Sequence, residues 1–310
     1  MPSFQFKIKF MLPDGNSIST DERVISLELP LDDHTIKFQL KQLPNTGYPS
    51  SFIFIGTGFK TEKEAFTAGI KIKNTLMLCS IKLPFGIDLG KDNTTAGFVK
   101  DVIESRLEEG VNLINDVHGL TVYQSDLPVE HVLGGNSSLC LAYSANSFYR
   151  EFESAYKYTV VFNDKLNLAL ELYNQSYFEL TMRARFLTLI SVIECLTEPD
   201  KESEKIISLL DGFIETIKTT EKDVSLDERN AICNRLGNLK RESISSACRN
   251  LIRKYIGEEF VKRFTFLYGL RSELVHNGKL PEGTNLGDVL QELENIASNV
   301  IYNSLISTTQ

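Results

Sequence analysis

An arginine and a histidine near the end of a predicted helix are the side chains best suited to phosphate chemistry. They lie in the segment Arg271-Ser272-Glu273-Leu274-Val275-His276-Asn277-Gly278. The imidazole of His276 can act as a general base or acid, while the guanidinium of Arg271 offers a fork of donors to phosphate oxygens. Such groups can activate a ribose 2′-hydroxyl, stabilise the charge on phosphorus and protonate the 5′-oxygen without a metal ion.

Three neighbouring side chains are candidate auxiliary groups. Tyr268 precedes Arg271 by one helical turn, Ser272 follows it directly, and Asn277 stands beside His276. Each can take part in a hydrogen bond at a reacting phosphate. Tyr268 also suits a helix core and Asn277 a helix end, so both residues have a purely structural interpretation as well.

The helix that must position these residues carries an arginine within its apolar stripe. Apolar side chains recur at helical spacing from Phe260 to Val275, and position 271 falls on the same face. We therefore expect Arg271 to point toward the interior or an interface. A buried guanidinium needs a carboxylate, a phosphate or a polar cleft to face.

The end of this helix decides whether the two catalytic candidates can meet. Asn277-Gly278, followed by Pro281, predicts the helix end, so His276 lies in the last turn. Residues five apart are rotated by about 140°, so Arg271 and His276 do not share a face. They converge only through a bend or across a two-fold interface. The structural alternative for His276 is a cation that gains about 0.3–1 kcal/mol from the helix dipole.

A second predicted helix, over 177–197, supplies a carboxylate for Arg271. Its apolar stripe runs from Met182 to Leu196, and Glu194 lies at the edge of that stripe. Glu194 is therefore a candidate partner of Arg271 inside the helical part. Such a pair either orients the guanidinium for a phosphate or is structural.

Together these segments resemble the HEPN domain, and most closely its Apea-like branch. The resemblance rests on Arg271-x4-His276 near a helix end and on the preceding helix Arg183-Ala184-Arg185-Phe186-Leu187-Thr188-Leu189-Ile190-Ser191-Val192-Ile193-Glu194-Cys195-Leu196. A third segment, Leu239-Lys240-Arg241-Glu242-Ser243-Ile244-Ser245-Ser246-Ala247, is similar to a middle helix of that branch. The likeness covers roughly residues 160 to 308.

The resemblance implies a helical bundle that dimerises and, in many members, a metal-independent ribonuclease with an Arg-x(4–6)-His motif. Such domains act in toxin, anti-phage or RNA-processing roles. In active members the position after the motif arginine is often Asn, Asp or His, and here it is Ser272. One motif supplies one histidine, whereas cleavage uses a general acid and a general base at the same time. The mechanism therefore favours two copies of the chain. We therefore expect a homodimer formed by the helical domain.

Composition favours a folded cytoplasmic protein of two domains. The chain has 310 residues, of which 42% are hydrophobic and 24% charged, near the average for globular proteins. It has no apolar run of 18 residues and no basic, apolar leader, so we expect neither membrane insertion nor secretion. Five cysteines without a CxxC pair, and three other histidines far apart, predict no disulfide framework, metal site or cofactor.

Charge is unevenly distributed along the chain. The net charge is −8, yet between residues 229 and 279 eleven Lys and Arg stand against four Glu, a net charge of +7. A basic patch beside the motif would attract phosphates. The alternative is two helices with solvated basic faces. The candidate RNA-binding residues are Arg249, Arg253, Lys254, Lys262 and Arg263.

The sequence predicts an α+β chain in which the spacing of apolar residues changes from alternation to helical periodicity near residue 160. Residues 1–160 form a mixed α/β domain for sensing or recruitment, with half-buried strands over Phe4–Phe10, Ile25–Leu29 and Ile36–Leu40. Gly56-Thr57-Gly58 is expected to form a turn. Thr61-Glu62-Lys63-Glu64 is a capping box that opens a helix to about Asn74, and another helix spans 97–109.

Residues 161–310 are predicted to form an all-α, HEPN-like bundle. Its expected helices are 163–174, 177–197, 201–218, 228–256 with a break near Gly237, 258–277 and 286–306.

Three functions remain open at this point. The first is a metal-independent endoribonuclease whose N-terminal domain meets an unknown trigger or partner. The second is an inactive HEPN module for dimerisation and RNA or protein binding, favoured if Ser272 disables the site. The third is a sensor whose N-terminal domain binds a small ligand.

Overall fold

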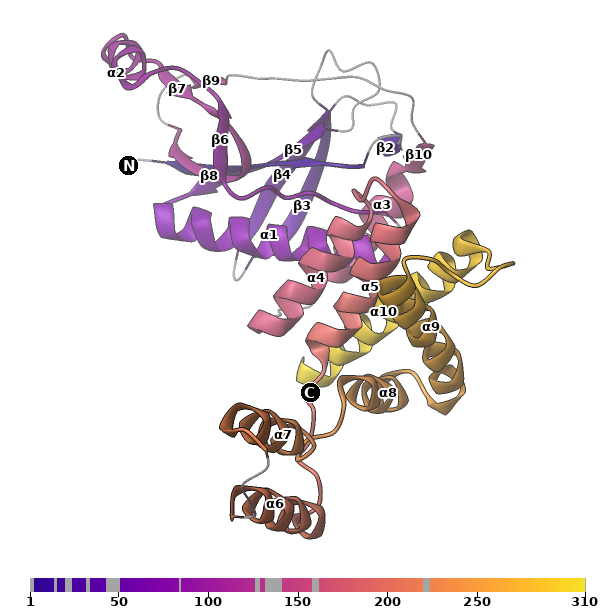
Figure 1. Cartoon of the computed structure of the whole chain (residues 1–310). Coiled ribbons are helices and arrows are strands. Elements are labelled where there is room, and N and C mark those ends of the chain that lie inside the picture. The colour runs from indigo at the N-terminus through magenta and orange to yellow at the C-terminus, as the bar shows by residue number, and fades with distance from the viewer. Residues whose placement is uncertain are drawn as a thin grey trace. The chain divides into compact units, whose positions relative to one another are not determined.

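The computed structural model describes residues 3–13, 16–19, 24–31, 34–42, 51–83, 85–125, 129–131, 141–157, 162–219 and 224–309. The chain is α+β, as the sequence predicts (Figure 1). It divides into two compact units, one of Met1–Phe162 with Tyr173–Leu180 and one of Asn163–Leu172 with Thr181–Gln310. No described helix is both long enough and apolar enough to cross a membrane.

The first unit is built on a six-stranded antiparallel sheet. Its strand order is β3-β4-β5-β1-β8-β6, so the first strand of the chain lies inside the sheet between two later strands. The three strands predicted from alternating residues are confirmed as β1, β3 and β4. The bounds are β1 Phe4–Met11, β3 Val24–Leu31, β4 His34–Gln42, β5 Ser51–Phe59, β6 Asn93–Ala96 and β8 Asp116–Gln124.

Helix α1, Glu62–Lys82, covers one face of this sheet. Phe6, Ile8 and Phe10 of β1 lie on that face and are fully buried. The helix begins as predicted, with the Thr61 hydroxyl accepting a hydrogen bond from the backbone N–H of Glu64 at 3.1 Å. The Glu64 carboxylate accepts from the N–H of Lys60, at 3.0 Å, one residue earlier than a capping box requires. The helix runs eight residues past Asn74 because its buried apolar side chains continue to Ile81.

The expectation that β1 is half-buried is wrong. On its other face Lys7 is fully buried and Lys9 is 6% exposed. The Lys9 ammonium pairs with the Asp116 carboxylate at 2.5 Å. Burial lowers the pKa of Lys7, and the neighbouring Asp116 raises it by less. Alternation of apolar and polar residues predicts a strand, but it does not show whether the polar face of that strand is also covered.

The predicted turn at Gly56-Thr57-Gly58 is also wrong, because all three residues belong to β5. Gly56 pairs with Phe6 across the sheet, and a Cβ atom on it would lie 2.3 Å from the ring carbon Cε1 of Phe6. The glycine is therefore a place of close approach within a strand, which is the other common reason for a strand glycine.

Shorter elements complete the first unit. Strand β2 (Asn16–Ser19) pairs in parallel with β10 (Leu141–Ser144). Strand β7 (Asn112–Ile114) pairs in parallel with β9 (Val129–His131). Helix α2 spans Lys100–Glu108 within the predicted range, and α3, Ala145–Tyr156, was not predicted. Helix α3 packs against α1, and its buried Phe152 stacks on Phe54 of the sheet with ring centroids 5.3 Å apart.

The second unit is helical. The helix predicted over 228–256 is two helices, α7 and α8, separated just after the expected break at Gly237, and α9 has the predicted bounds. Buried apolar side chains of α5, α8, α9 and α10 form its core. The helices are α4 Asp164–Ser176, α5 Met182–Leu196, α6 Glu204–Thr219, α7 Leu226–Asn238, α8 Ile244–Tyr255, α9 Glu258–Asn277 and α10 Leu286–Thr309, and residues of α4 from Tyr173 onward belong to the first unit.

Candidate active site

Arg271 lies in the second half of α9 and faces Glu194 of α5. The guanidinium Nη2 and the carboxylate Oε1 are 3.7 Å apart, and the side chains are 31% and 22% exposed. The expected pairing of these residues is therefore confirmed. Both positions lie beside buried stripes, with Leu267, Leu270 and Leu274 buried on α9 and Ile190 and Ile193 on α5.

Tyr268 completes this group. Its hydroxyl donates a hydrogen bond to Glu194 Oε1 at 2.7 Å, and the Arg271 guanidinium carbon lies 5.8 Å from the centre of its ring. Burial, and then the hydrogen bond to Glu194, raise the pKa of Tyr268 to about 12. The phenol thus stays protonated at neutral pH and serves as a donor.

The guanidinium forms an ion pair with Glu194 but no hydrogen bond, while Tyr268 donates to the same carboxylate oxygen. At 3.7 Å the contact is longer than a hydrogen bond. Within the described residues, the Arg271 guanidinium makes no hydrogen bond. Its N–H groups are oriented by Glu194 and Tyr268 and remain able to donate to another anion.

These residues line an open depression of about 530 Å³ in the helical unit. Burial raises the pKa of the Cys195 thiol to about 11, so this thiol is protonated at neutral pH and is a poor nucleophile. The Ser191 hydroxyl donates to the Leu187 carbonyl at 3.1 Å within its own helix. The charged groups of the depression are therefore the Arg271 guanidinium and the Glu194 carboxylate that pairs with it. Its lining is Leu172, Ser191, Glu194, Cys195, Ile244, Tyr268 and Arg271.

His276 is exposed on the last turn of α9. The helix ends as predicted, with Gly278 in the left-handed region at φ 69° and its N–H donating to the Leu274 carbonyl at 3.1 Å. The regular helix keeps His276 about 140° from Arg271, on the side opposite the buried stripe. Within one chain the imidazole therefore does not face the depression.

Two of the four predicted auxiliary residues lie outside the depression. Ser272 and Asn277 are both exposed, and the Asn277 amide donates to the Glu273 carboxylate at 2.5 Å. Glu194 and Tyr268 are the two that contact Arg271. One cation near the helix end was not anticipated. Arg183, at the start of α5, donates to the Gly278 carbonyl at 3.5 Å, a contact that only the packing of α5 against α9 discloses.

The predicted RNA-binding residues are engaged to different degrees. Arg253 pairs with Glu258 and Arg263 with Glu292, while Arg249 donates to the Ser245 hydroxyl at 2.8 Å. The Lys254 ammonium lies 4.8 Å from the centre of the Tyr255 ring, and Lys262 is exposed. Intramolecular carboxylates therefore offset part of the positive charge that the sequence places in this region.

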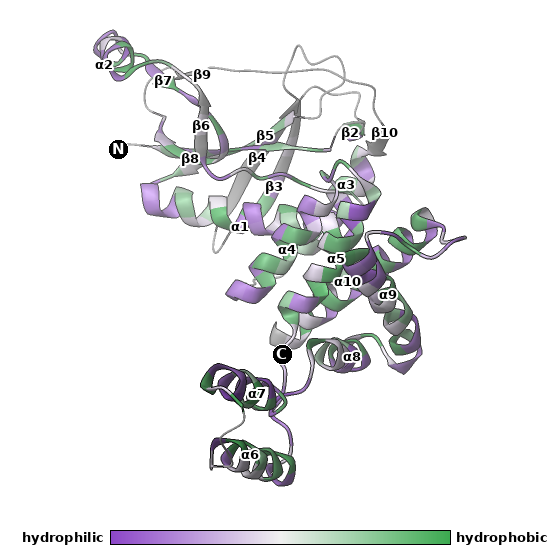
Figure 2. Cartoon of the chain, viewed as in Figure 1, coloured by the Kyte–Doolittle hydropathy of each residue, from purple (hydrophilic) through white to green (hydrophobic). Residues whose placement is uncertain are grey.

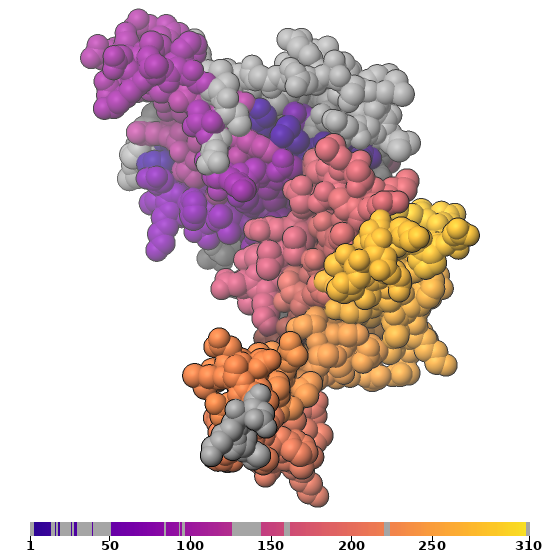
Figure 3. All heavy atoms as spheres, viewed as in Figure 1, coloured from indigo at the N-terminus to yellow at the C-terminus, as the bar shows by residue number. Residues whose placement is uncertain are grey.

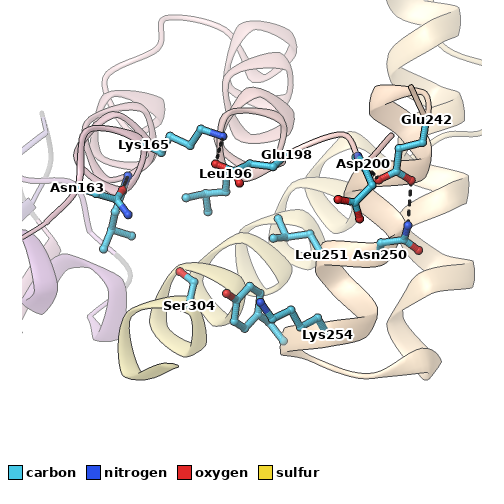
Figure 4. A pocket seen from close by; sticks show the side chains of 13 residues that line it. Asn163, Lys165, Leu196, Glu198, Asp200, Glu242, Asn250, Leu251, Lys254 and Ser304 are labelled. Atoms are coloured by element: carbon cyan, nitrogen blue, oxygen red, sulfur yellow. Dashed lines mark hydrogen bonds and ion pairs between the residues drawn. The ribbon is translucent and has the colours of Figure 1, made fainter. Parts of the chain in front are cut away.

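A second cavity, of about 320 Å³, lies among α4, α5, α8 and α10 (Figure 4). Its polar side chains mostly bond to one another. The Lys165 ammonium donates to Glu198 at 2.7 Å, and the Glu242 carboxylate accepts from the Asn250 amide at 2.9 Å and from the backbone N–H of Asp200 at 3.1 Å. These bonds tie the helix ends together, which gives them a structural role.

The part of the chain that the structure describes holds no group of three or more His, Cys, Asp or Glu that could bind a metal ion. In comparisons with known proteins, no family model, no curated protein and no solved structure matches this chain.

Proposed function

We propose that the protein is a metal-independent endoribonuclease with a HEPN-like helical unit, in which Arg271 and His276 act on the scissile phosphate. The observation that carries this proposal is the state of Arg271. Its guanidinium is oriented by Glu194 and Tyr268 at an open depression, yet makes no hydrogen bond to a described residue. A pre-oriented guanidinium with available donors is suited to a phosphate that becomes more negative in the transition state.

In the proposed reaction, one His276 removes the proton of a ribose 2′-hydroxyl, and the oxygen attacks the adjacent phosphorus. A second His276 protonates the departing 5′-oxygen, leaving a 2′,3′-cyclic phosphate and a 5′-hydroxyl. Arg271 donates to the non-bridging oxygens as their charge grows. Because His276 faces away from Arg271 within one chain, the proposal requires two copies of the chain.

Substrate recognition falls first to the cations that carry no intramolecular ion pair. Lys254 and Lys262 are exposed and make no ion pair with any described carboxylate, whereas Arg253 and Arg263 are paired. Phosphate contacts contribute affinity with little sequence preference, and they weaken as salt rises. The proposed substrate is therefore RNA bound mainly through its backbone.

The test is cleavage of end-labelled RNA in EDTA by wild type, Arg271→Ala and His276→Ala. We expect both variants to lose at least about a hundredfold in rate, the usual contribution of a general acid or base or of a transition-state donor. Arg150→Ala is the matched control, since Arg150 is exposed and, among the described residues, pairs only with its neighbour Glu151. Equal cleavage by wild type and His276→Ala would exclude the proposed role of the histidine.

A second function is favoured by the same geometry. His276 is solvent-facing and Ser272 stands where active relatives of the proposed family often have Asn, Asp or His. Both features suit an inactive HEPN-like module that binds RNA through Arg271 without cutting it. This function predicts RNA binding that Arg271→Ala weakens, with intact RNA recovered from every reaction.

A further inference from the structure

Helices α6 and α7 form a hairpin that packs on little besides itself. Cys233 approaches the Ile214 carbonyl at 3.9 Å, and the Lys240 ammonium pairs with Asp211 at 2.5 Å, so α7 runs back along α6. Within the described chain, neither helix packs extensively on any other element. Figures 1 and 3 show the hairpin as a lobe of the helical unit.

A short neck holds the base of the hairpin. The chain entering α6 and the chain leaving α7 lie antiparallel, with the N–H of Glu202 donating to the Lys240 carbonyl at 2.9 Å and the N–H of Glu242 to the Asp200 carbonyl at 3.0 Å. The neck positions the hairpin without covering it.

The seam between the two helices buries very little. Ile207, Ile214 and Ile217 of α6 are only half-buried, and Leu210 is the one buried side chain among the described residues of the hairpin. Short helices gain most of their stability from burying an apolar face. A hairpin with so small a core is therefore expected to need a further surface.

That surface is the side of the hairpin that carries five exposed apolar side chains, which we call the hairpin face. Helix periodicity places the members on α6 roughly 90° around the helix axis from the residues that face α7. The members on α7 and its C-cap lie roughly 80° around from the residues that face α6, on the same side of the antiparallel pair. Figure 2 shows hydrophobic colouring along both helices. The members and their exposed fractions are Ile206 42%, Leu209 59%, Phe213 51%, Ile232 39% and Leu239 58%.

We propose that the hairpin face binds the hairpin face of a second copy, forming an antiparallel four-helix bundle about a two-fold axis. A two-fold interface must be self-complementary, because the same patch meets itself. Ile232 lies at the middle of α7, with Glu228 one turn before it and Arg235 one turn after it on the same side. When two α7 helices cross antiparallel at Ile232, Glu228 of each copy, one of whose carboxylate oxygens accepts from Ser225 in the capping box of α7, lies beside Arg235 of the other.

The size of the hairpin face sets the expected affinity between the two copies. Two helices of this length present a face roughly 20 Å on each side, smaller than the about 800 Å² per partner of a standard stable interface. The dimer should therefore be concentration-dependent. None of the hairpin-face residues lines the Arg271 depression, so this inference goes beyond the proposed cleavage and is tested by mass instead of activity.

The experiment is sedimentation velocity of the full chain over a hundredfold concentration range. Wild type should show a monomer–dimer equilibrium, and Leu209→Glu and Phe213→Glu should each raise the dissociation constant at least tenfold, about 1.4 kcal/mol. The matched control is Leu226→Glu, because Leu226 is 64% exposed on the other side of the seam. A wild type that stays monomeric throughout, or equal weakening by Leu226→Glu, would overturn the proposal.

A crosslink tests the register without altering the apolar face. In a Cys233→Ser background, Ile232→Cys should form an oxidised dimer, because the two-fold brings both copies of position 232 within disulfide range. Leu226→Cys in the same background should remain monomeric. Equal crosslinking of the two variants would contradict the two-fold at Ile232.

Discussion

The hydroxyl of Tyr268 and the guanidinium of Arg271 share one carboxylate, that of Glu194. The hydroxyl donates to the Glu194 oxygen nearest the guanidinium, which itself lies 3.7 Å from that oxygen. The carboxylate thus orients the guanidinium electrostatically while leaving its donors available. Sequence patterns could predict the Arg271–Glu194 contact, because both residues interrupt apolar stripes. The role of the phenol depends on an interhelical distance that no single-helix pattern contains.

Lys7 provides a residue-level prediction on pH and stability. Its ammonium is fully buried on β1 beside the Lys9–Asp116 pair, and it has no hydrogen-bond partner among the described residues. Burial lowers its pKa below the ordinary 10.5, so the unfolded chain binds the proton more tightly than the folded one does. This destabilisation is complete below the folded pKa and disappears as pH rises through 10.5.

We therefore expect Lys7→Met to stabilise the protein at neutral pH by about 1–3 kcal/mol, the usual cost of an unsatisfied buried polar group. The gain should shrink as the pH approaches 10.5, measured by urea denaturation at several pH values. Lys91→Met, at an exposed site, is the control. A gain of constant size across this range would show that packing, not charge, is responsible.

At the level of elements, α9 shows which signals a sequence carries well. Its predicted bounds are correct because the stop is local, with Gly278 at positive φ directly after the last apolar turn. The burial of β1 and the place of Gly56 inside β5 were predicted wrongly. Both depend on strands that pair with β1 from far along the chain, and a local pattern does not contain that information.

The end of α9 can be tested with two glycines. Gly278→Ala should destabilise the protein by about 1–2 kcal/mol, the cost of a left-handed conformation for an L-residue. An added Cβ would contact nothing within 4 Å, so this backbone cost is the whole expected effect. Gly269→Ala, in the middle of the same helix and equally unobstructed, should stabilise by about 0.5–1 kcal/mol. Urea denaturation measures both changes, and shifts of the same sign would contradict this account of the helix end.

At the level of the whole molecule, the proposed cleavage requires a second copy because of where His276 lies. The 100° rotation per residue already predicted that His276 and Arg271 diverge, and the regular end of α9 leaves no bend to bring them together. The hairpin face is proposed as a surface at which two copies meet, and it contains neither His276 nor Arg271. Sequence patterns alone did not identify it, because an amphipathic helix looks the same whether its apolar face meets its own chain or another.

The central claim, that two copies of His276 cooperate in RNA cleavage, is tested most directly by mixing. Wild type and His276→Ala are combined at a fixed total concentration, allowed to exchange, and assayed in EDTA for RNA carrying 2′,3′-cyclic phosphate ends. If each reaction needs both histidines, equal mixing leaves roughly one quarter of the wild-type rate, because only that fraction of dimers has two intact copies. A rate near one half would mean that each copy acts alone, and no cleavage by wild type would contradict the proposed activity itself.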